Sequence, residues 1–172
     1  GRADKIVSYI LVTGAPGSKW SGVVRDIYTS NESLVYQAEY IRDGLEWPTW
    51  ARNMHLLAGS GKLRSLHNMC TVNALCLETL PEFLSYLIKF KEQYGRDFPS
   101  FTLNILRFPS FQSPLALPDN IRTLHKDRLQ EWYDKNADNE LLHEHELNQT
   151  QRLIDYLDVV KTPHSDSFDM PK

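Results

Sequence analysis

The chain has 172 residues, the size of one ordinary domain. Hydrophobic residues make up 41% and charged residues 24%, so the chain can bury enough apolar surface to exclude disorder throughout. With 19 basic and 22 acidic side chains the net charge is −3, which gives no support to binding of nucleic acid or of an anionic membrane. No run approaches the roughly 18 apolar residues of a membrane helix. Residues 1–4 do not open a signal peptide, so we expect a cytoplasmic protein.

Residues 1–28 predict a strand, a loop and a helix. Residues 5–13 are rich in β-branched side chains and lead into the glycine loop 14–17. Helical spacing of apolar residues follows at Trp20, Val23, Val24 and Ile27. A short polar connection over 29–33 then separates this unit from the rest of the chain.

The remainder of the chain predicts two more strands and four further helical segments. The strands are expected over 65–75 and 101–108. The helices are expected over 36–57, where Pro48 kinks or restarts the helix, from the capping-box spacing Thr79-x-x-Glu82 to Gly95, and over 119–136 and 144–161. An irregular loop is expected over 110–118 and a loose tail over 162–172. Strands that alternate with helices indicate an α/β fold with a small, mostly parallel sheet and crossover helices.

The loop after the first predicted strand is a candidate phosphate site. Its glycines, Gly14 and Gly17, let the backbone approach a ligand, while Ser18, Lys19 and Ser21 supply donors and positive charge. The loop resembles the phosphosulfate-binding loop of P-loop sulfotransferases, and more closely that of sulfotransferase-like proteins of phages. It departs from them at Gly17, where those enzymes usually carry a basic residue. An ordinary turn between a strand and a helix is the alternative.

Other polar motifs predict no site. His143 and His145 stand two residues apart, which on a helix separates their side chains by about 200°, so we expect them not to share a metal ion. The two cysteines, Cys70 and Cys76, are too few for a disulfide framework or a cysteine-only metal site, and we expect buried thiols.

From Thr29 onward the chain carries a series of short motifs in a consistent order. They are Ser30-Asn-Glu32, Glu39-Tyr-Ile-Arg-Asp-Gly44, Trp47-x-x-Trp50-x-x-Asn53, Cys70-Thr-Val-Asn-Ala-Leu75, Leu80-Pro-Glu-Phe83, Leu103-Asn-Ile-Leu-Arg-Phe-Pro109, Leu115-Ala-Leu-Pro118, His145-Glu-Leu-Asn148 and Arg152-Leu-Ile-Asp-Tyr-Leu157. In order and spacing they resemble the second half of a radical S-adenosylmethionine barrel, and in particular its twitch-domain enzymes. The resemblance covers most of the chain.

The resemblance implies a partial barrel and an enzyme that binds S-adenosylmethionine on a [4Fe–4S] cluster and generates a 5′-deoxyadenosyl radical. It places Ser30 near the ribose or the methionine part of the ligand. It assigns Arg42 to the methionine carboxylate, a task suited to a fork of donors. Asn73 would face the same cavity, and Leu106 and Phe108 would flank the adenine. The alternative for Arg42 is an exposed helix residue.

One departure from the family limits the expected activity. The motif Cys-x3-Cys-x2-Cys, which supplies three thiolates to the cluster, is missing from this sequence, and Cys70 and Cys76 do not replace it. We therefore expect no cluster on this chain, and a relative that binds S-adenosylmethionine or a related nucleoside but is not active alone. The alternatives are a sulfotransferase-type phosphate binder and a non-catalytic structural or assembly module. A half-barrel would also expose strand edges, which a second copy or the missing barrel half would cover.

Overall fold

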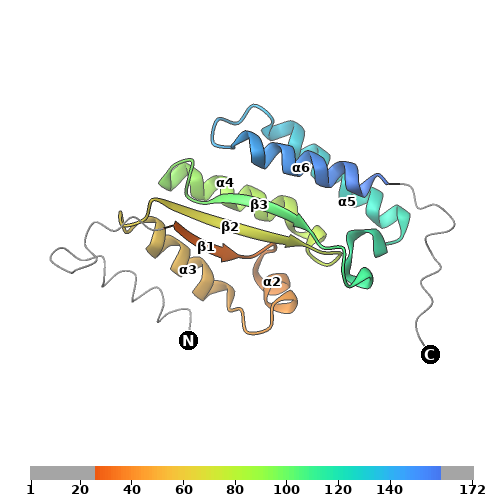
Figure 1. The fold of residues 1–172 in the computed structure, drawn as a ribbon, viewed down its shortest axis with the longest axis horizontal. Coiled ribbons are helices and arrows are strands. Elements are labelled where there is room, and N and C mark those ends of the chain that lie inside the picture. The colour runs from red at the N-terminus through yellow and green to blue at the C-terminus, as the bar shows by residue number, and fades with distance from the viewer. Residues whose placement is uncertain (1–25, 160–172) are drawn as a thin grey trace.

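The computed structural model describes residues 26–159, in which three parallel strands alternate with five α-helices. In chain order the elements are β1 (Asp26–Ser30), α2 (Val35–Ile41), α3 (Trp47–Ala58), β2 (Ser65–Val72), α4 (Leu80–Tyr94), β3 (Ser100–Ile105), α5 (Asp119–Asn136) and α6 (Glu144–Leu157). The strands lie side by side in the order β1-β2-β3 (Figure 1). The α/β class with a small parallel sheet is thereby confirmed. None of the helices of this part of the chain is long and apolar enough to cross a membrane.

The sheet has one covered and one more open face. Alternation along β2 buries Leu66, Asn68, Cys70 and Val72, while the side chains between them are half-buried or exposed. Parallel pairing aligns the rows of the three strands, and on the open face it places Tyr28 of β1 beside His67 of β2 and Ser100 of β3. In Figure 1 the strands lie in front of α4, which covers the other face.

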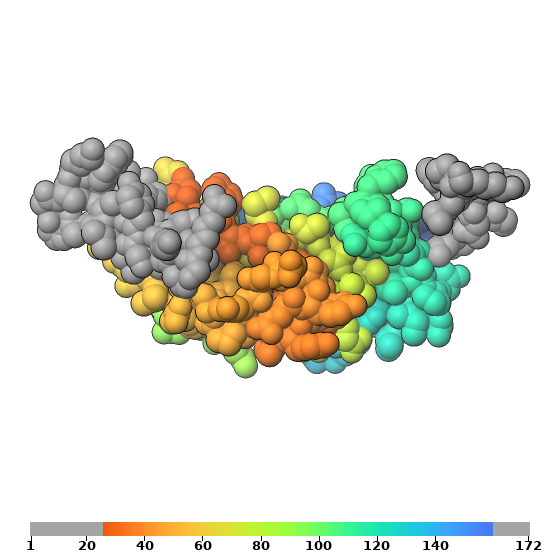
Figure 2. Space-filling model, turned by 90° about the horizontal axis from the view of Figure 1, so that it is seen from below, coloured from red at the N-terminus to blue at the C-terminus, as the bar shows by residue number. Residues whose placement is uncertain are grey.

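Apolar stripes on the helices fill the space under the sheet. A larger cluster joins α4, α5 and α6 to β2 and β3, and a smaller one joins α3 to β2 and α4. The fully buried apolar side chains of α4 are Leu80, Phe83, Leu84 and Leu87. Each of these stabilises the fold by roughly 1.5–3 kcal/mol relative to exposure. The helices α2 and α3 form a continuous surface next to β1 when the molecule is seen from below (Figure 2).

The outer edge of β3 is sealed by side chains of α6. Glu146 Oε1 accepts a hydrogen bond from the Phe101 amide at 2.7 Å, and Gln149 Oε1 accepts one from the Leu103 amide at 2.5 Å. Arg152 Nη2 donates to the Leu103 carbonyl at 2.8 Å. The expectation that strand edges are exposed is therefore wrong for β3, because three side chains take the place of a neighbouring strand.

A buried ion pair ties α4 to the start of α6. The side chains of Lys91 and Glu146 are both 0% exposed, and Lys91 Nζ lies 2.8 and 2.7 Å from the two Glu146 oxygens. Lys91 also donates to the Leu141 carbonyl at 3.1 Å. The second Glu146 oxygen accepts from the His143 amide at 2.7 Å, so the carboxylate links Lys91, β3 and the first turn of α6.

Several predicted boundaries differ from the structure. Ile27 belongs to β1 and not to a helix, so the polar connection begins only after Ser30. The second and third predicted strands end earlier than expected, at Val72 and Ile105. The helix expected over 36–57 is two helices, with Pro48 in the first turn of the second. Of the strand-loop-helix expected over 1–28, residues 1–25 lie outside the described residues, as does the tail expected over 162–172.

The capping box expected at Thr79 does not form. Thr79 precedes α4, but its side chain makes no capping hydrogen bond. Its hydroxyl instead accepts from the Leu34 amide at 3.4 Å, which connects the start of α4 to the start of α2. A tertiary contact has therefore replaced the local one that the spacing predicted.

Candidate functional site

Polar and apolar side chains gather where the three strands end. Ser30 is the last residue of β1, Asn73 directly follows β2, and Leu106 directly follows β3. Because the strands are parallel, their carboxyl ends meet at one edge of the sheet, the edge at which open α/β sheets bind ligands. The structure therefore brings three predicted site residues, Ser30, Asn73 and Leu106, to one edge of the sheet.

Arg42 joins this edge from the end of α2. It directly follows the last helical residue, and its amide donates to the Ala38 carbonyl. Its Nη2 donates to Ser30 Oγ at 3.0 Å and to Glu32 Oε2 at 2.6 Å, and its Nε lies 3.0 Å from Glu32 Oε1. Ser30 Oγ in turn donates to the Met69 carbonyl at 2.9 Å. The two predicted site residues, Ser30 and Arg42, thus form one hydrogen-bonded unit with Glu32, and Arg42 is not an exposed helix residue.

Glu32 determines which part of Arg42 can meet a ligand. Its side chain is 2% exposed, and it takes up the Nε–Nη2 edge of the guanidinium, while the Arg42 side chain keeps 28% exposure. Within residues 26–159, Nη1 of Arg42 makes no hydrogen bond. A carboxylate arriving from solvent would therefore bind at Nη1, not across the full fork that the sequence suggested.

Three buried polar residues lie close to this unit in the chain or in the sheet. Asn31 and Ser33 flank Glu32, and Asn68 of β2 donates through Nδ2 to the Asn31 carbonyl at 2.8 Å. Among the described residues, Asn31 Nδ2, Ser33 Oγ and Asn68 Oδ1 are buried without a hydrogen-bond partner. Leaving such a group unpaired costs about 1–3 kcal/mol, and proteins tend to retain it where it has a function. These three residues were missed from the sequence, although Asn68 interrupts an otherwise apolar buried row.

Asn73 has a structural task in the turn that follows β2. Its Oδ1 accepts from the amides of Leu75 and Cys76 at 2.9 and 3.1 Å, and its Nδ2 donates to the Thr71 carbonyl at 3.3 Å. The sequence had suggested that Asn73 lies on the strand, but the strand ends one residue before it, at Val72. Its amide shapes the loop at the ligand edge.

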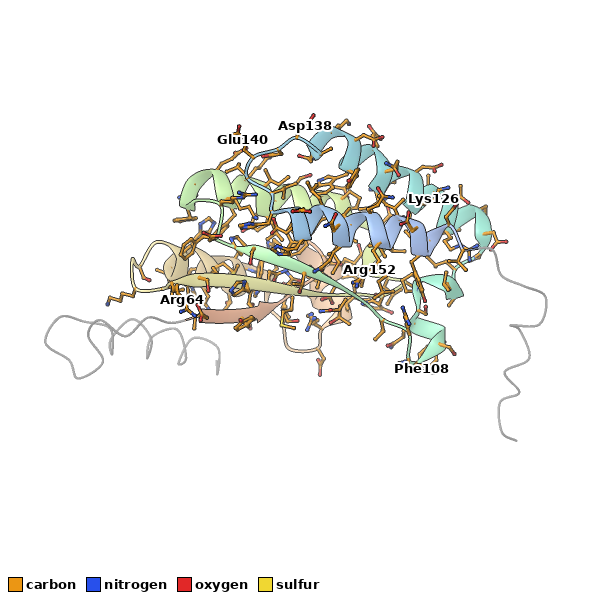
Figure 3. All side chains as sticks on the ribbon, turned by 45° about the horizontal axis from the view of Figure 1, so that its top comes forward. Arg64, Phe108, Lys126, Asp138, Glu140 and Arg152 are labelled. Atoms are coloured by element: carbon orange, nitrogen blue, oxygen red, sulfur yellow. The ribbon has the colours of Figure 1, made fainter. Side chains whose placement is uncertain are left out.

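The apolar pair predicted to flank an adenine follows β3. The Leu106 amide still pairs with the Val72 carbonyl at 2.8 Å, and its side chain is half-buried. Phe108 is 75% exposed and lies beyond the end of β3 (Figure 3). An aromatic ring at this position can stack on a flat ligand.

Both cysteines are buried, free thiols on the covered side of the sheet. Burial raises the pKa of Cys76 to about 12, and burial with the nearby thiol of Cys76 raises the pKa of Cys70 well above its usual range. The ligand of a metal is the thiolate and not the thiol. Among residues 26–159 no group of three or more His, Cys, Asp or Glu side chains could hold a metal ion.

We expect neither thiol to react in the folded protein. Maleimide added at neutral pH should leave native protein unmodified over a period in which urea-unfolded protein is labelled at both positions. Burial withholds both access and the thiolate form. Mass spectrometry of the labelled chain measures this, with Cys76→Ser as the variant that assigns the second label. Rapid labelling of native protein would contradict the burial of Cys70 and Cys76.

A second polar network lies at the opposite, amino-terminal edge of the strands. His67 Nδ1 lies 2.5 Å from Ser100 Oγ, His67 Nε2 lies 2.9 Å from Ser65 Oγ, and Ser65 donates to Asp26 Oδ1 at 2.5 Å. A hydrogen bond from Arg64 keeps the pKa of Asp26 below its usual value. A serine hydroxyl beside a histidine ring, as in Ser100 and His67, is similar to a nucleophile with its general base. In parallel α/β folds, however, this edge serves stability, whereas the carboxyl edge serves catalysis.

The histidine pair of the last helix has a different geometry from the one expected. His143 precedes α6 in an extended conformation, so the helical spacing argument does not apply to it. Its ring stacks on that of His145 at 5.3 Å between centroids, and its Nε2 lies 2.9 Å from Asp97 Oδ1. The His143 ring is therefore in contact with the Asp97 carboxylate.

The five phosphate-site candidates, Gly14, Gly17, Ser18, Lys19 and Ser21, lie outside the described residues. Comparisons with protein-family models, with curated proteins and with solved structures find no match to this chain.

Proposed function

We propose that this chain binds S-adenosylmethionine or a related nucleoside at the carboxyl edge of its sheet, as a relative of the radical S-adenosylmethionine proteins that is not active alone. The observation that supports this proposal is the unit of Ser30, Glu32 and Arg42. It combines a buried carboxylate, a partly exposed guanidinium and an exposed hydroxyl at the edge where parallel sheets take ligands. In the same proposal, β1, β2 and β3 are consecutive strands of a partial barrel.

In this site each group has a physical task. Glu32 holds the guanidinium of Arg42 in place through two nitrogens, which leaves Nη1 to receive the carboxylate of the ligand. Ser30, anchored on the Met69 carbonyl, lies beside that position and presents its hydroxyl oxygen to the ligand. Phe108 and Leu106 provide apolar surface for the base.

The residues of this chain do not fit the iron–sulfur cluster of the family. A [4Fe–4S] cluster takes its ligands as thiolates, and the sequence holds only two cysteines, both fully buried with raised pKa values. The proposed activity is binding, and radical chemistry would need the missing ligands from another chain.

Calorimetry with S-adenosylmethionine and S-adenosylhomocysteine tests the proposal. We expect Arg42→Lys to weaken binding roughly tenfold, because an ammonium cannot keep the Glu32 contact and also reach the ligand carboxylate. The matched control is Arg128→Lys, since Arg128 also pairs with a glutamate, Glu82 at 2.7 Å, but on the helical side of the molecule. Equal affinities of wild type and Arg42→Lys, or no heat of binding with wild type, would contradict the proposal.

A further inference from the structure

A solvent-open pocket lies between the end of β3 and the second half of α6. It has a volume of about 480 Å³ and is lined by Asn104, Ile105, Arg107, Arg152, Asp155, Tyr156 and Val159. Figure 3 shows Arg152 between α6 and β3. None of these residues belongs to the Ser30–Arg42 unit, which lies at the end of β1.

The charge of the pocket is positive on balance. Two arginines line it against the single carboxylate of Asp155, which already accepts a hydrogen bond from Gln151 Nε2 at 2.9 Å. Within residues 26–159, the guanidinium of Arg107 has no hydrogen-bond or ion-pair partner. It lies 5.8 Å from the centroid of the Tyr156 ring, a distance typical of a cation–π contact.

The two arginines differ in how firmly they are held. Arg152 is fixed by its bond to the Leu103 carbonyl, and within residues 26–159 its guanidinium makes no other hydrogen bond. Arg107 is placed by Tyr156, whose hydroxyl lies 3.3 Å from Ser113 Oγ. Asn104 is exposed and also lines the pocket, where its side-chain amide adds a donor. Guanidinium and amide donors that line one open pocket are suited to the oxygens of a phosphate or a carboxylate.

We propose that this pocket binds the oxyanion group, phosphate or carboxylate, of a small organic molecule. Only β2 separates β1 from β3. At the usual spacing of neighbouring strands, the end of β3 therefore lies about 10 Å across the sheet from Ser30 at the end of β1. A nucleoside at β1 and an anionic molecule at β3 can therefore occupy the same edge together. Binding of the anion does not require the nucleoside, so this inference does not depend on the proposed function.

Titration of the wild-type chain with inorganic phosphate and, separately, with malonate tests the pocket. The measurement is NMR of the arginine Nε–Hε groups at constant ionic strength, without S-adenosylmethionine. We expect the signals of Arg107 and Arg152 to shift, and Arg107→Gln to weaken binding about fivefold or more. A stronger response to phosphate supports a phosphorylated ligand, and a stronger response to malonate supports a carboxylate ligand.

The control variant is Arg64→Gln, which removes an exposed arginine at the other end of the molecule from Phe108 (Figure 3). It should leave both titrations unchanged. No shift at Arg107 with either anion, or the same affinity in Arg107→Gln as in wild type, would overturn the proposal. Because no nucleoside is present, this result would leave the proposed function to its own calorimetric test.

Discussion

Lys91→Met is expected to lower the free energy of unfolding by about 3–5 kcal/mol, the usual effect of removing one partner of a buried ion pair. Both side chains of the pair are 0% exposed, so the variant leaves the Glu146 carboxylate buried without its cation. Burial also keeps the pKa of Lys91 below its usual value, although the Glu146 charge opposes that shift. Urea unfolding followed by circular dichroism measures the loss.

Two further variants make this result specific. Lys135→Met removes a lysine whose pair with Glu131 is exposed on α5, and it should change stability by less than about 0.5 kcal/mol. Glu146→Gln should be destabilising too, because Glu146 also accepts from the amides of Phe101 and His143. A loss below about 1 kcal/mol for Lys91→Met would show that Lys91 and Glu146 are not buried together as described.

The pair of Arg42 and Glu32 should respond asymmetrically to mutation. Arg42→Met leaves Glu32, 2% exposed, as an uncompensated buried charge, and we expect it to lower stability by about 3 kcal/mol. Glu32→Gln leaves Arg42, whose side chain is 28% exposed and can still reach water, so we expect a loss of about 1–2 kcal/mol. The order of the two losses therefore reports which partner is desolvated.

Urea unfolding of both variants at pH 7 measures this difference, with Arg128→Met as the control for loss of a surface arginine. Equal losses, or a larger loss for Glu32→Gln, would contradict the burial of Glu32. If the asymmetry holds, Glu32→Gln becomes the more useful variant for binding work. It should stay folded while releasing the Nε–Nη2 edge of Arg42 for a ligand carboxylate.

The sequence predicted the bounds of α4 and α5 better than those of the strands, whereas α6 ends at Leu157 and not at residue 161 as expected. The bounds of α5 agree with the expectation, because Pro118 and the polar run after Asn136 delimit it. The pattern did not predict β1, because it assigned Ile27 to a helix. It predicted β2 and β3 too long at their carboxyl ends, where the apolar side chains of Leu75 and Phe108 continue the pattern but are exposed. Hydrophobicity alone does not separate a strand from an apolar loop that follows it.

For the candidate site, motif order identified Ser30 and Arg42 but not their partners. The burial of Glu32 depends on how α2 returns to β1, a tertiary feature that local spacing does not encode. The same holds for Arg107 and Arg152, which lie far apart in sequence and meet only because α6 runs along β3. The sequence shows which residue types are present, but only the fold shows which of these side chains lie close together.

The contacts of α6 along β3 allow the sheet to grow in one direction only. Glu146, Gln149 and Arg152 bind the outward backbone groups of Phe101 and Leu103, so no further strand can pair there without displacing them. Any additional strand, from another part of this chain or from another molecule, must therefore join at β1. Such a strand would turn β1 into an interior strand and place Ser30 inside a wider sheet, where a bound ligand would have protein on both sides.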